Sequence, residues 1–332
     1  MSLERASVLL ANVTDLEEAM RLAGVIEESG YRRVWLAETS SIDAAALGGA
    51  LAHRTSLEVG TAIVPVYSRT PALLSMMAAT WSAFGGGRPV HLGIGAGGQV
   101  IVERWHGVPF ERPLTTVSDT LEVLRQAFTG DKTDYEGVTR RSHGFRLGYG
   151  PQPAVRLYVG GMGPKMQELA ARRADGLILT WVSPRILDDF QARFAAQIAA
   201  AGRERSEVTL VARAYVAVVD DVDAVRQAVR REVVEYIVSP PYARYFSSVG
   251  FDSEVNAVNE AFARGDREGT AAAVSERLLD ELLVVGRDAD EVAERLHAYH
   301  RAGADDLMIQ PVLPARGGDP ARTIAAVATA LS

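Results

Sequence analysis

The chain has 332 residues, 48% of them hydrophobic, which is enough to bury the core of one large domain or of two ordinary ones. It carries 35 Lys and Arg against 42 Asp and Glu, a net charge of −7, with both signs mixed along the sequence. This distribution argues against nucleic acid or an anionic membrane as a partner. The absence of cysteine excludes disulfides, thiolate catalysis and cysteine–metal sites. We see neither a signal peptide nor a membrane-spanning segment, and we expect a cytoplasmic protein.

Short apolar runs alternate with helical patterns along the chain, which favours parallel βα units. The first half predicts four strands, near residues 6–11, 33–37, 57–63 and 90–94. Thr14-x-x-Glu17 predicts the start of the first helix as a capping box. Thr70 as N-cap, followed by Pro71, predicts the start of another. Residues 130–155 predict an excursion of turns and short strands.

The second half continues the alternation, with strands predicted near residues 156–159, 176–180, 208–218 and 306–310. Residues 221–302 hold helical patterns and no convincing strand. Eight strands close most simply as a barrel. We therefore predict a single α/β domain over 1–332, a (β/α)8 TIM barrel. Its enlarged helical insertion after strand seven, residues 221–302, is expected to cover the barrel mouth.

Chemistry in such a barrel takes place at the C-terminal ends of the strands. The positions to consider there are Ala11-Asn12, Glu38-Thr39, Thr61–Pro65, Gly95–Gly98, Gly160–Pro164, Thr180-Trp181, Arg213 and Gln310-Pro311.

The strongest local motif is Gly160-Gly161-Met162-Gly163-Pro164, which follows a strand and opens a helix. Glycines let a phosphate approach backbone N–H groups, and the helix N-terminus adds positive potential. Pro164 suits the first helical turn, where an N–H is not needed. The same residues also suit an ordinary tight turn, so both interpretations stand.

A second glycine motif follows strand four, where Gly93, Gly95 and Gly98 satisfy G-x-G-x-x-G. A dinucleotide-binding interpretation requires a helix that starts in the glycines and an acid about 20 residues on. Asp119 has that spacing, but Pro109 interrupts the segment and the motif is not at the first strand. The better interpretation is that these glycines leave space for a flat ring over the barrel mouth.

Glu38 and Thr39 follow strand two, where a carboxylate can hold a ring nitrogen or move a proton. The alternative for Thr39 is a helix N-cap. His297 and His300 share a helix face without an obvious third ligand, so we expect no metal site.

Together these segments resemble the bacterial luciferase-like superfamily, and within it the deazaflavin (coenzyme F420)-dependent branch similar to methylenetetrahydromethanopterin reductase. The resemblance runs from the first strand to the last. The segments that carry it are Tyr31–Glu38, Val59–Pro65, Gly86–Gly95, Tyr158–Pro164, Ala174–Gly176, Tyr245–Phe246, Gly250–Asp252 and Val285–Gly286.

The resemblance implies hydride transfer between coenzyme F420 and a small organic substrate, in a homodimeric enzyme. It implies a non-prolyl cis peptide at Ala62–Ile63, within a bulge of strand three behind the ring. The ring would lie against Thr61, Ala62, Ile63, Gly95, Ala96 and Gly97, and the phosphate on Gly160, Gly161, Met162 and Gly163. Glu38 and Thr39 would be the catalytic residues.

The sequence departs from the family where Thr39 replaces a frequent histidine and Gly98 a frequent acid. The usual proton donor is thereby in question, with Glu38, Glu103 or Tyr67 as substitutes. Two alternatives follow. One is an FMN-dependent monooxygenase of the same superfamily, and the other is a non-catalytic flavin- or deazaflavin-binding relative.

Overall fold

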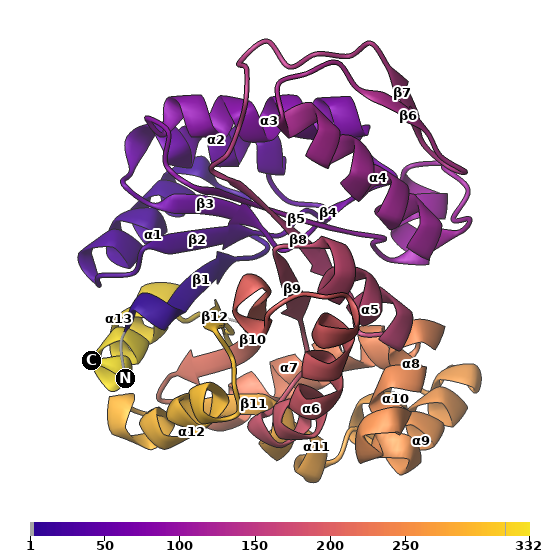
Figure 1. Ribbon diagram of the computed structural model, residues 1–332. Coiled ribbons are helices and arrows are strands. Elements are labelled where there is room, and N and C mark those ends of the chain that lie inside the picture. Colours follow the sequence, from indigo (N-terminus) through magenta and orange to yellow (C-terminus); the bar gives the residue numbers. More distant parts are fainter. Residues whose placement is uncertain (1–2, 316) are drawn as a thin grey trace.

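The computed structural model describes residues 3–315 and 317–332, so residues 1, 2 and 316 of the expected domain lie outside the described part. Within it, eight parallel strands close into a ring, and the predicted (β/α)8 barrel is confirmed (Figure 1). In order around the ring they are β1 (Ala6–Leu10), β2 (Arg33–Leu36), β3 (Glu58–Thr61), β5 (Val90–Gly95), β8 (Val155–Gly160), β9 (Gly176–Leu179), β10 (Thr209–Val218) and β12 (Asp306–Pro311).

Helices alternate with these strands along the chain and pack around the outside of the ring (Figure 1). They are α1 (Leu16–Glu28), α2 (Ala44–Arg54), α3 (Pro71–Phe84), α4 (Pro113–Phe128), α5 (Pro164–Arg173), α6 (Pro184–Ala200), α12 (Ala289–Arg301) and α13 (Pro320–Leu331). No helix in the described ranges has the length and apolar character needed to cross a bilayer.

The starts of these helices follow their capping residues. Thr70 caps α3 ahead of Pro71, as predicted. The predicted capping box at Thr14 is wrong by one residue, because Asp15 is the N-cap of α1 and accepts a hydrogen bond from the Glu18 N–H (2.9 Å). A carboxylate is the better cap here, since its charge also complements the positive end of the helix.

Several short elements connect the main ones. The predicted excursion contains an antiparallel hairpin, β6 (Asp134–Glu136) and β7 (Arg141–His143). One-turn 3₁₀ helices cover Leu3–Arg5 and Arg205–Glu207, and a π-helical turn covers Ile101–Trp105.

The insertion after β10 contains a strand that the sequence did not predict. Its helical elements are α7 (Val222–Ile237), α8 (Pro240–Phe246), a π-helical turn (Ser247–Phe251), α9 (Asp252–Ala263), α10 (Arg267–Ala272) and α11 (Glu276–Leu282). The expectation of helices alone is wrong at β11 (Leu283–Gly286), which pairs in parallel with the end of β10. This run of four residues carries no periodicity of its own, and only its partner strand makes it extended.

Two aromatic rings fill the centre of the barrel. Trp35 and Tyr158 are buried and meet edge to face, with ring centroids 5.3 Å apart. The neighbouring strands carry glycine at the positions in register with these rings, because there is no room for a side chain. A Cβ on Gly60 would lie 2.5 Å from the Trp35 ring, and one on Gly176 would overlap Tyr158. The barrel is therefore a packed core below its mouth.

The third strand is interrupted by a bulge. Gly60 aligns with His91, and Val64 of the short strand β4 (Val64–Pro65) aligns with Ile94, so residues 61–63 face only two residues of β5. The Ala62–Ile63 peptide bond within it is cis, as the resemblance predicted.

Thr61 closes the gap in the ladder that this bulge leaves. Its hydroxyl donates to the Gly93 carbonyl oxygen (2.8 Å) and accepts from the Gly93 N–H (3.0 Å). On the other side, the Ala62 N–H donates to the Leu36 carbonyl oxygen (2.8 Å). The bulge is thus anchored to both neighbouring strands.

A buried ionic network occupies the amino-terminal end of the barrel. Arg33 lies between Glu58 (2.9 Å) and Asp306 (2.7 Å). The Ser7 hydroxyl donates to Asp306 (2.7 Å) and accepts from the Trp35 indole N–H (2.9 Å). Every charge in the network faces an opposite one, as buried charges require.

His91 extends this network in its neutral form. Its Nε2 lies 2.9 Å from Glu58 and its Nδ1 lies 3.0 Å from the Tyr158 hydroxyl. A carboxylate only accepts, so Nε2 carries the proton and Nδ1 accepts from Tyr158. Burial lowers the pKa of His91 to about 4, although the Glu58 hydrogen bond opposes this. Burial alone would raise the pKa of Glu58, but the hydrogen bond from His91 and the charge of Arg33 hold it at about 2.

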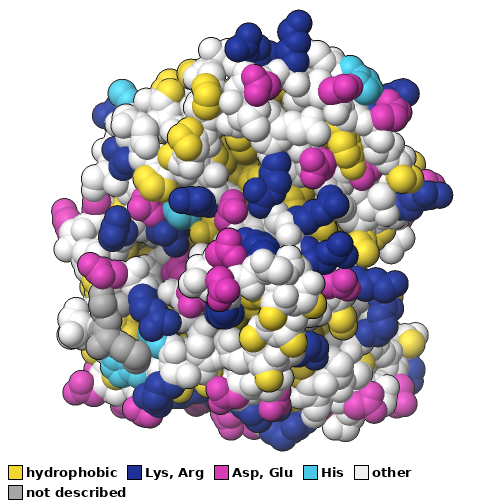
Figure 2. Space-filling model, viewed as in Figure 1, with side chains coloured by type: hydrophobic (Ala, Val, Ile, Leu, Met, Phe, Trp, Pro, Cys, Tyr) yellow, Lys and Arg dark blue, Asp and Glu magenta, His cyan; other side chains and the backbone are white. Residues whose placement is uncertain are grey.

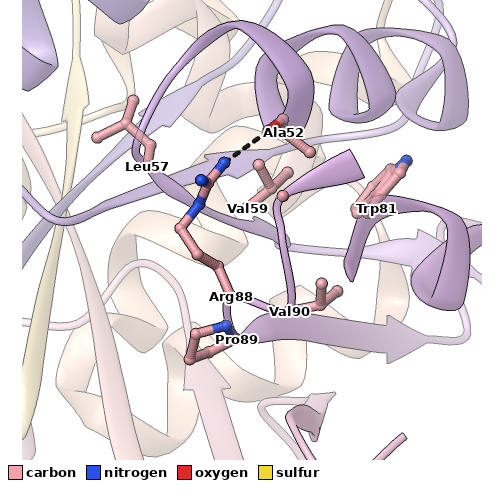
Figure 3. Close-up of a pocket in the computed structure, with 8 residues that line it drawn as sticks. Ala52, Leu57, Val59, Trp81, Arg88, Pro89 and Val90 are labelled. Carbon is pink, nitrogen blue, oxygen red and sulfur yellow. Dashed lines mark hydrogen bonds between the residues drawn. The ribbon is translucent and has the colours of Figure 1, made fainter. Parts of the chain in front are cut away.

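A small void, too narrow to hold a water molecule, lies outside the ring at this same end. Figure 3 shows Arg88 reaching past it to the Ala52 carbonyl oxygen at the end of α2. Arg88 also donates to Thr55 and so ties the α2 terminus to the start of β5. Because the void is at the amino ends of the strands, it belongs to the packing of the fold and not to its chemistry.

The low pKa of His91 predicts acid destabilisation in a defined pH range. The unfolded chain, in which a histidine has a pKa near 6.5, takes up the proton first. The stability contributed by His91 is therefore complete above pH 6.5 and is lost as the pH falls towards 4, by up to about 1.4 kcal/mol per pH unit. Urea unfolding of the wild type and of His91→Gln between pH 7.5 and 4.5 measures this.

The glutamine variant retains a donor for Glu58 but cannot titrate, so its stability should fall less steeply over that range. Equal slopes for the two proteins would contradict the assignment. The contribution of Glu58 is lost in a separate range, from pH 4.5 towards 2.

Candidate active site

The floor of the barrel mouth is the side chain of Ile63, which lies over two glycines. A Cβ on Gly160 would lie 2.8 Å from Ile63 Cγ2, and one on Gly95 would lie 3.1 Å from its Cδ1. Ile63 and Ala62 also pack on the apolar centre of the barrel. The fold thus brings these predicted ring-binding residues together as one uncharged surface. Thr61 lies beneath it, fully buried and occupied with Gly93.

Ala96 and Gly97 form the edge of this floor on the β5 side. Ala96 is half-buried, and Gly97 is exposed with a φ of +73°, a conformation that favours glycine. A Cβ on Gly97 would also lie 3.2 Å from the Pro65 Cβ. The backbone is therefore open at this edge, where a flat ring could approach it.

The dinucleotide interpretation of Gly93–Gly98 does not match the structure around it. Asp119, the acid with the required spacing, is buried in α4 and already accepts from the Tyr135 hydroxyl (2.8 Å). It also accepts from the N–H of Thr139 (2.7 Å) and of Arg140 (3.2 Å). Its role is to hold the hairpin β6–β7 on α4, so it is not available to a ribose.

The turn Gly160–Gly163 leads directly into α5, with Gly163 as N-cap and Pro164 as the first helical residue. Gly161 donates its N–H to the Ile178 carbonyl oxygen (3.3 Å), and a Cβ there would overlap Met166. Gly163 is exposed with free space around it. Since the first N–H groups of a helix have no acceptor within it, the turn offers donors to an anion at Gly163.

A groove of about 370 Å³ runs along α4 and α5, and Lys165 lines the end of it that is next to this turn. Lys165, Arg172 and Arg173 line it, and each Arg is loosely paired with an acid, Glu168 or Glu122, at 3.6–3.7 Å. In Figure 2, basic side chains gather over the region of α5 on the right of the view, while the rest of the visible face mixes both signs. Lys165, in the first turn of α5, is therefore the basic side chain beside the glycine turn, whereas Arg172 and Arg173 lie in the last turn at the other end of the helix.

Glu38 is held in an ion pair that the sequence did not predict. Arg69 donates from Nε (3.1 Å) and Nη2 (2.6 Å) to the Glu38 carboxylate and also pairs with Asp43. The Glu38 N–H donates to the Ile63 carbonyl oxygen (3.3 Å), which places the acid beside the bulge. Thr39 follows it with an exposed side chain. Arg69 lies just before the Thr70 cap, and no local pattern distinguished it.

The other two candidate proton donors are less favourably placed. The Tyr67 hydroxyl donates to the Glu111 backbone carbonyl oxygen (2.5 Å). Glu103 is exposed and accepts from Gln99 (3.1 Å). Of the three residues considered, only Glu38 contacts the bulge.

Arg213 of β10 and Gln310 of β12 form a polar cluster at the mouth, and neither was given a role from the sequence. Arg213 Nε donates to Gln310 Oε1, and its guanidinium lies 4.9 Å from the centre of the Tyr215 ring. Glu232 of α7 is hydrogen-bonded to Gln310. Burial raises the pKa of Glu232, although the Arg213 charge opposes this.

Aromatic residues of the insertion pack on Trp181, which follows β9. Trp181, with φ +52°, stacks on Tyr215 with ring centroids 3.8 Å apart, and its carbonyl oxygen accepts from the Tyr245 hydroxyl (2.8 Å). Tyr236 meets the edge of Trp181 at 5.2 Å. A positive φ is rare for a bulky side chain and is often found at functional sites.

Comparisons with known proteins extend over nearly the whole chain. The sequence profile of the luciferase-like monooxygenase family matches residues 2–306. A 5,10-methylenetetrahydromethanopterin reductase of Archaeoglobus fulgidus is 32% identical over 302 residues, which covers 89% of this chain and 88% of the relative. The coenzyme F420-dependent tetrahydromethanopterin reductase of Methanopyrus kandleri superposes with a TM-score of 0.83 at 20% identity, over 98% of both chains. An F420-dependent secondary alcohol dehydrogenase superposes with a TM-score of 0.77 at 19% identity, over 99% of both chains.

The contact of Ile63 with Gly160 predicts a coupled pair. Gly160→Ala should destabilise the protein by about 1–3 kcal/mol, because its methyl group overpacks against Ile63. In an Ile63→Ala background the same change should cost less than about 0.5 kcal/mol, because the obstructing Cγ2 is gone. Denaturant unfolding of the four proteins measures the coupling.

Gly163→Ala is the matched control. Nothing lies within 4 Å of its Cβ and its φ of −79° suits alanine, so it should leave stability nearly unchanged. The same loss for Gly160→Ala in both backgrounds would contradict the packing described here.

Proposed function

Since the chain belongs to the luciferase-like monooxygenase family, we propose that it is a coenzyme F420-dependent oxidoreductase that exchanges a hydride between the deazaflavin and a small organic substrate. The observation that carries this proposal is the meeting, at one barrel mouth, of an uncharged floor and a glycine turn that opens a helix. The floor suits a flat ring, and the turn suits its phosphate. The Archaeoglobus relative is a methylenetetrahydromethanopterin reductase, and the similar Methanopyrus tetrahydromethanopterin reductase is F420-dependent, which favours F420 over FMN.

Each part of the mouth then has a role. The floor residues would hold the ring, and they are Ala62, Ile63, Gly95, Ala96 and Gly97. The turn Gly160–Gly163 would hold the phosphate, with Lys165 adding positive charge beside it. Thr61 would act by positioning, because its bonds to Gly93 hold the bulge in place. When bound, the coenzyme supplies the ring carbon that carries the hydride.

Glu38 and Thr39 would accept or donate the proton that the reaction moves. As a carboxylate fixed by Arg69 and adjacent to Ile63, Glu38 can accept a hydrogen bond or a proton from a bound molecule. The exposed Thr39 hydroxyl can donate or accept. The aromatic residues around Trp181 would exclude water from the same space, as the insertion would by covering the mouth. A homodimeric state and a cytoplasmic location stay predictions.

Cofactor titration tests this proposal. The purified protein should bind F420 with saturation, followed by the fluorescence of the deazaflavin, and should bind FMN at least about tenfold more weakly. Gly163→Pro should weaken F420 binding about tenfold, because it removes one charge-assisted hydrogen bond while its φ of −79° already suits proline. Gly163→Ala keeps the N–H and should bind within about twofold of the wild type.

Tight FMN binding without a response to F420 would overturn the choice of coenzyme in favour of a flavin monooxygenase. F420 binding without turnover of any alcohol, aldehyde, ketone or imine in a broad panel would favour a non-catalytic relative. Equal affinities of the two Gly163 variants would remove the turn from the phosphate site.

A further inference from the structure

Arg213 lies inside the barrel at its mouth. Val211 of β10 and Met308 of β12 both belong to the apolar centre of the barrel. Arg213 lies two residues after Val211 on β10, and its Cα is in register with that of Met308. Side chains two residues apart share a face of a strand, so Arg213 faces the interior one layer closer to the mouth.

This position is continuous with the proposed coenzyme site. The Tyr215 ring, over which Arg213 lies, is linked through its hydroxyl to Thr180 (3.0 Å). The Thr180 N–H in turn contacts the Met162 sulfur in the glycine turn (3.4 Å). A molecule bound at Arg213 would therefore lie beside one bound at Gly160–Gly163.

The guanidinium of Arg213 forms no ion pair, unlike the guanidinium groups of Arg33 and Arg69. Arg33 pairs with two carboxylates, and Arg69 does the same. Arg213 is half-buried and donates to the neutral amide of Gln310, and it forms an ion pair with no residue in the ranges 3–315 and 317–332. The nearby Glu232 carboxyl acts on Arg213 electrostatically but forms no ion pair with it, so the Nη1 and Nη2 groups are left for an anionic ligand.

The groups around Arg213 indicate which anion this would be. Tyr215, Tyr236, Tyr242 and Glu232 influence its charge, and they include no Lys or second Arg. A doubly charged phosphate would need more positive charge, whereas a single planar guanidinium matches a carboxylate. The tyrosine rings offer an apolar wall for the carbon part of the ligand.

We propose that Arg213, oriented by Gln310, is a specificity-determining residue that binds a carboxylate group of the organic substrate, with the substrate's apolar part against Tyr215, Tyr236 and Tyr242. This inference rests on the proposed function, because it places the substrate at the same mouth as the coenzyme. Gln310 holds the Arg213 guanidinium in place, and the guanidinium contacts the substrate carboxylate.

Matched carboxylate and carboxamide probes test the inference. Calorimetry would compare acetate, butyrate and benzoate with acetamide, butyramide and benzamide. The wild type should bind at least one carboxylate about tenfold more tightly than its amide, the effect of one charge-assisted bidentate contact. Arg213→Met should abolish that preference and leave amide binding unchanged. Gln310→Glu places a carboxylate beside Arg213 and should abolish the carboxylate preference as well. This variant provides the test if Arg213→Met is unstable.

Arg231→Met is the control, because it removes the same charge from an exposed position on α7 and should retain the preference. F420 affinity is measured in every variant and should stay within about twofold of the wild type. The inference is overturned if the wild type shows no carboxylate preference, or if Arg213→Met loses F420 binding and keeps the preference. If the wild type shows the preference and binds no F420, the proposed coenzyme fails while the anion subsite stands.

Discussion

The two hydrogen bonds between Thr61 and Gly93 hold together the one interrupted strand of the barrel, and the mouth depends on them. Three residues of one strand oppose two of its neighbour, so the normal ladder cannot continue. A side-chain hydroxyl replaces the missing backbone pair on one side, and β2 anchors the other. Without this substitute, Ile63 would not be held over Gly95 and Gly160, and the floor of the mouth would not form.

The barrel separates two kinds of polar chemistry by its apolar centre. At the amino end, Arg33, Glu58, His91 and Asp306 satisfy one another completely, which suits a structural network. At the mouth, Arg213 donates to the neutral amide of Gln310 and forms no ion pair within the described chain, although the Glu232 carboxyl acts on its charge. Trp35 and Tyr158 lie between them and exclude water. This division separates the charges that stabilise the fold from the one for which we propose a role in ligand binding.

The alternation of strands and helices was predictable from local sequence, because burial on both faces of a parallel sheet leaves continuous apolar runs. The start of α3 at Thr70 and Pro71, and the opening of α5 after Gly163, follow from capping chemistry in the same way. Where two local signals competed, the prediction failed by a residue, as at Thr14 and Asp15. β11 was missed because four residues without periodicity become a strand only beside β10.

The sequence by itself determined the barrel, the order of its elements and the segments that meet at the mouth, because each of these depends on neighbours within a few residues. The tertiary structure alone decided what those residues do there. Gly95 and Gly160 turn out to make room for Ile63, and Glu38 to pair with Arg69 across 31 residues. Arg213 acquires Gln310 across 97 residues. Contacts between residues so far apart leave no local pattern, since they are set by strand register around the closed ring.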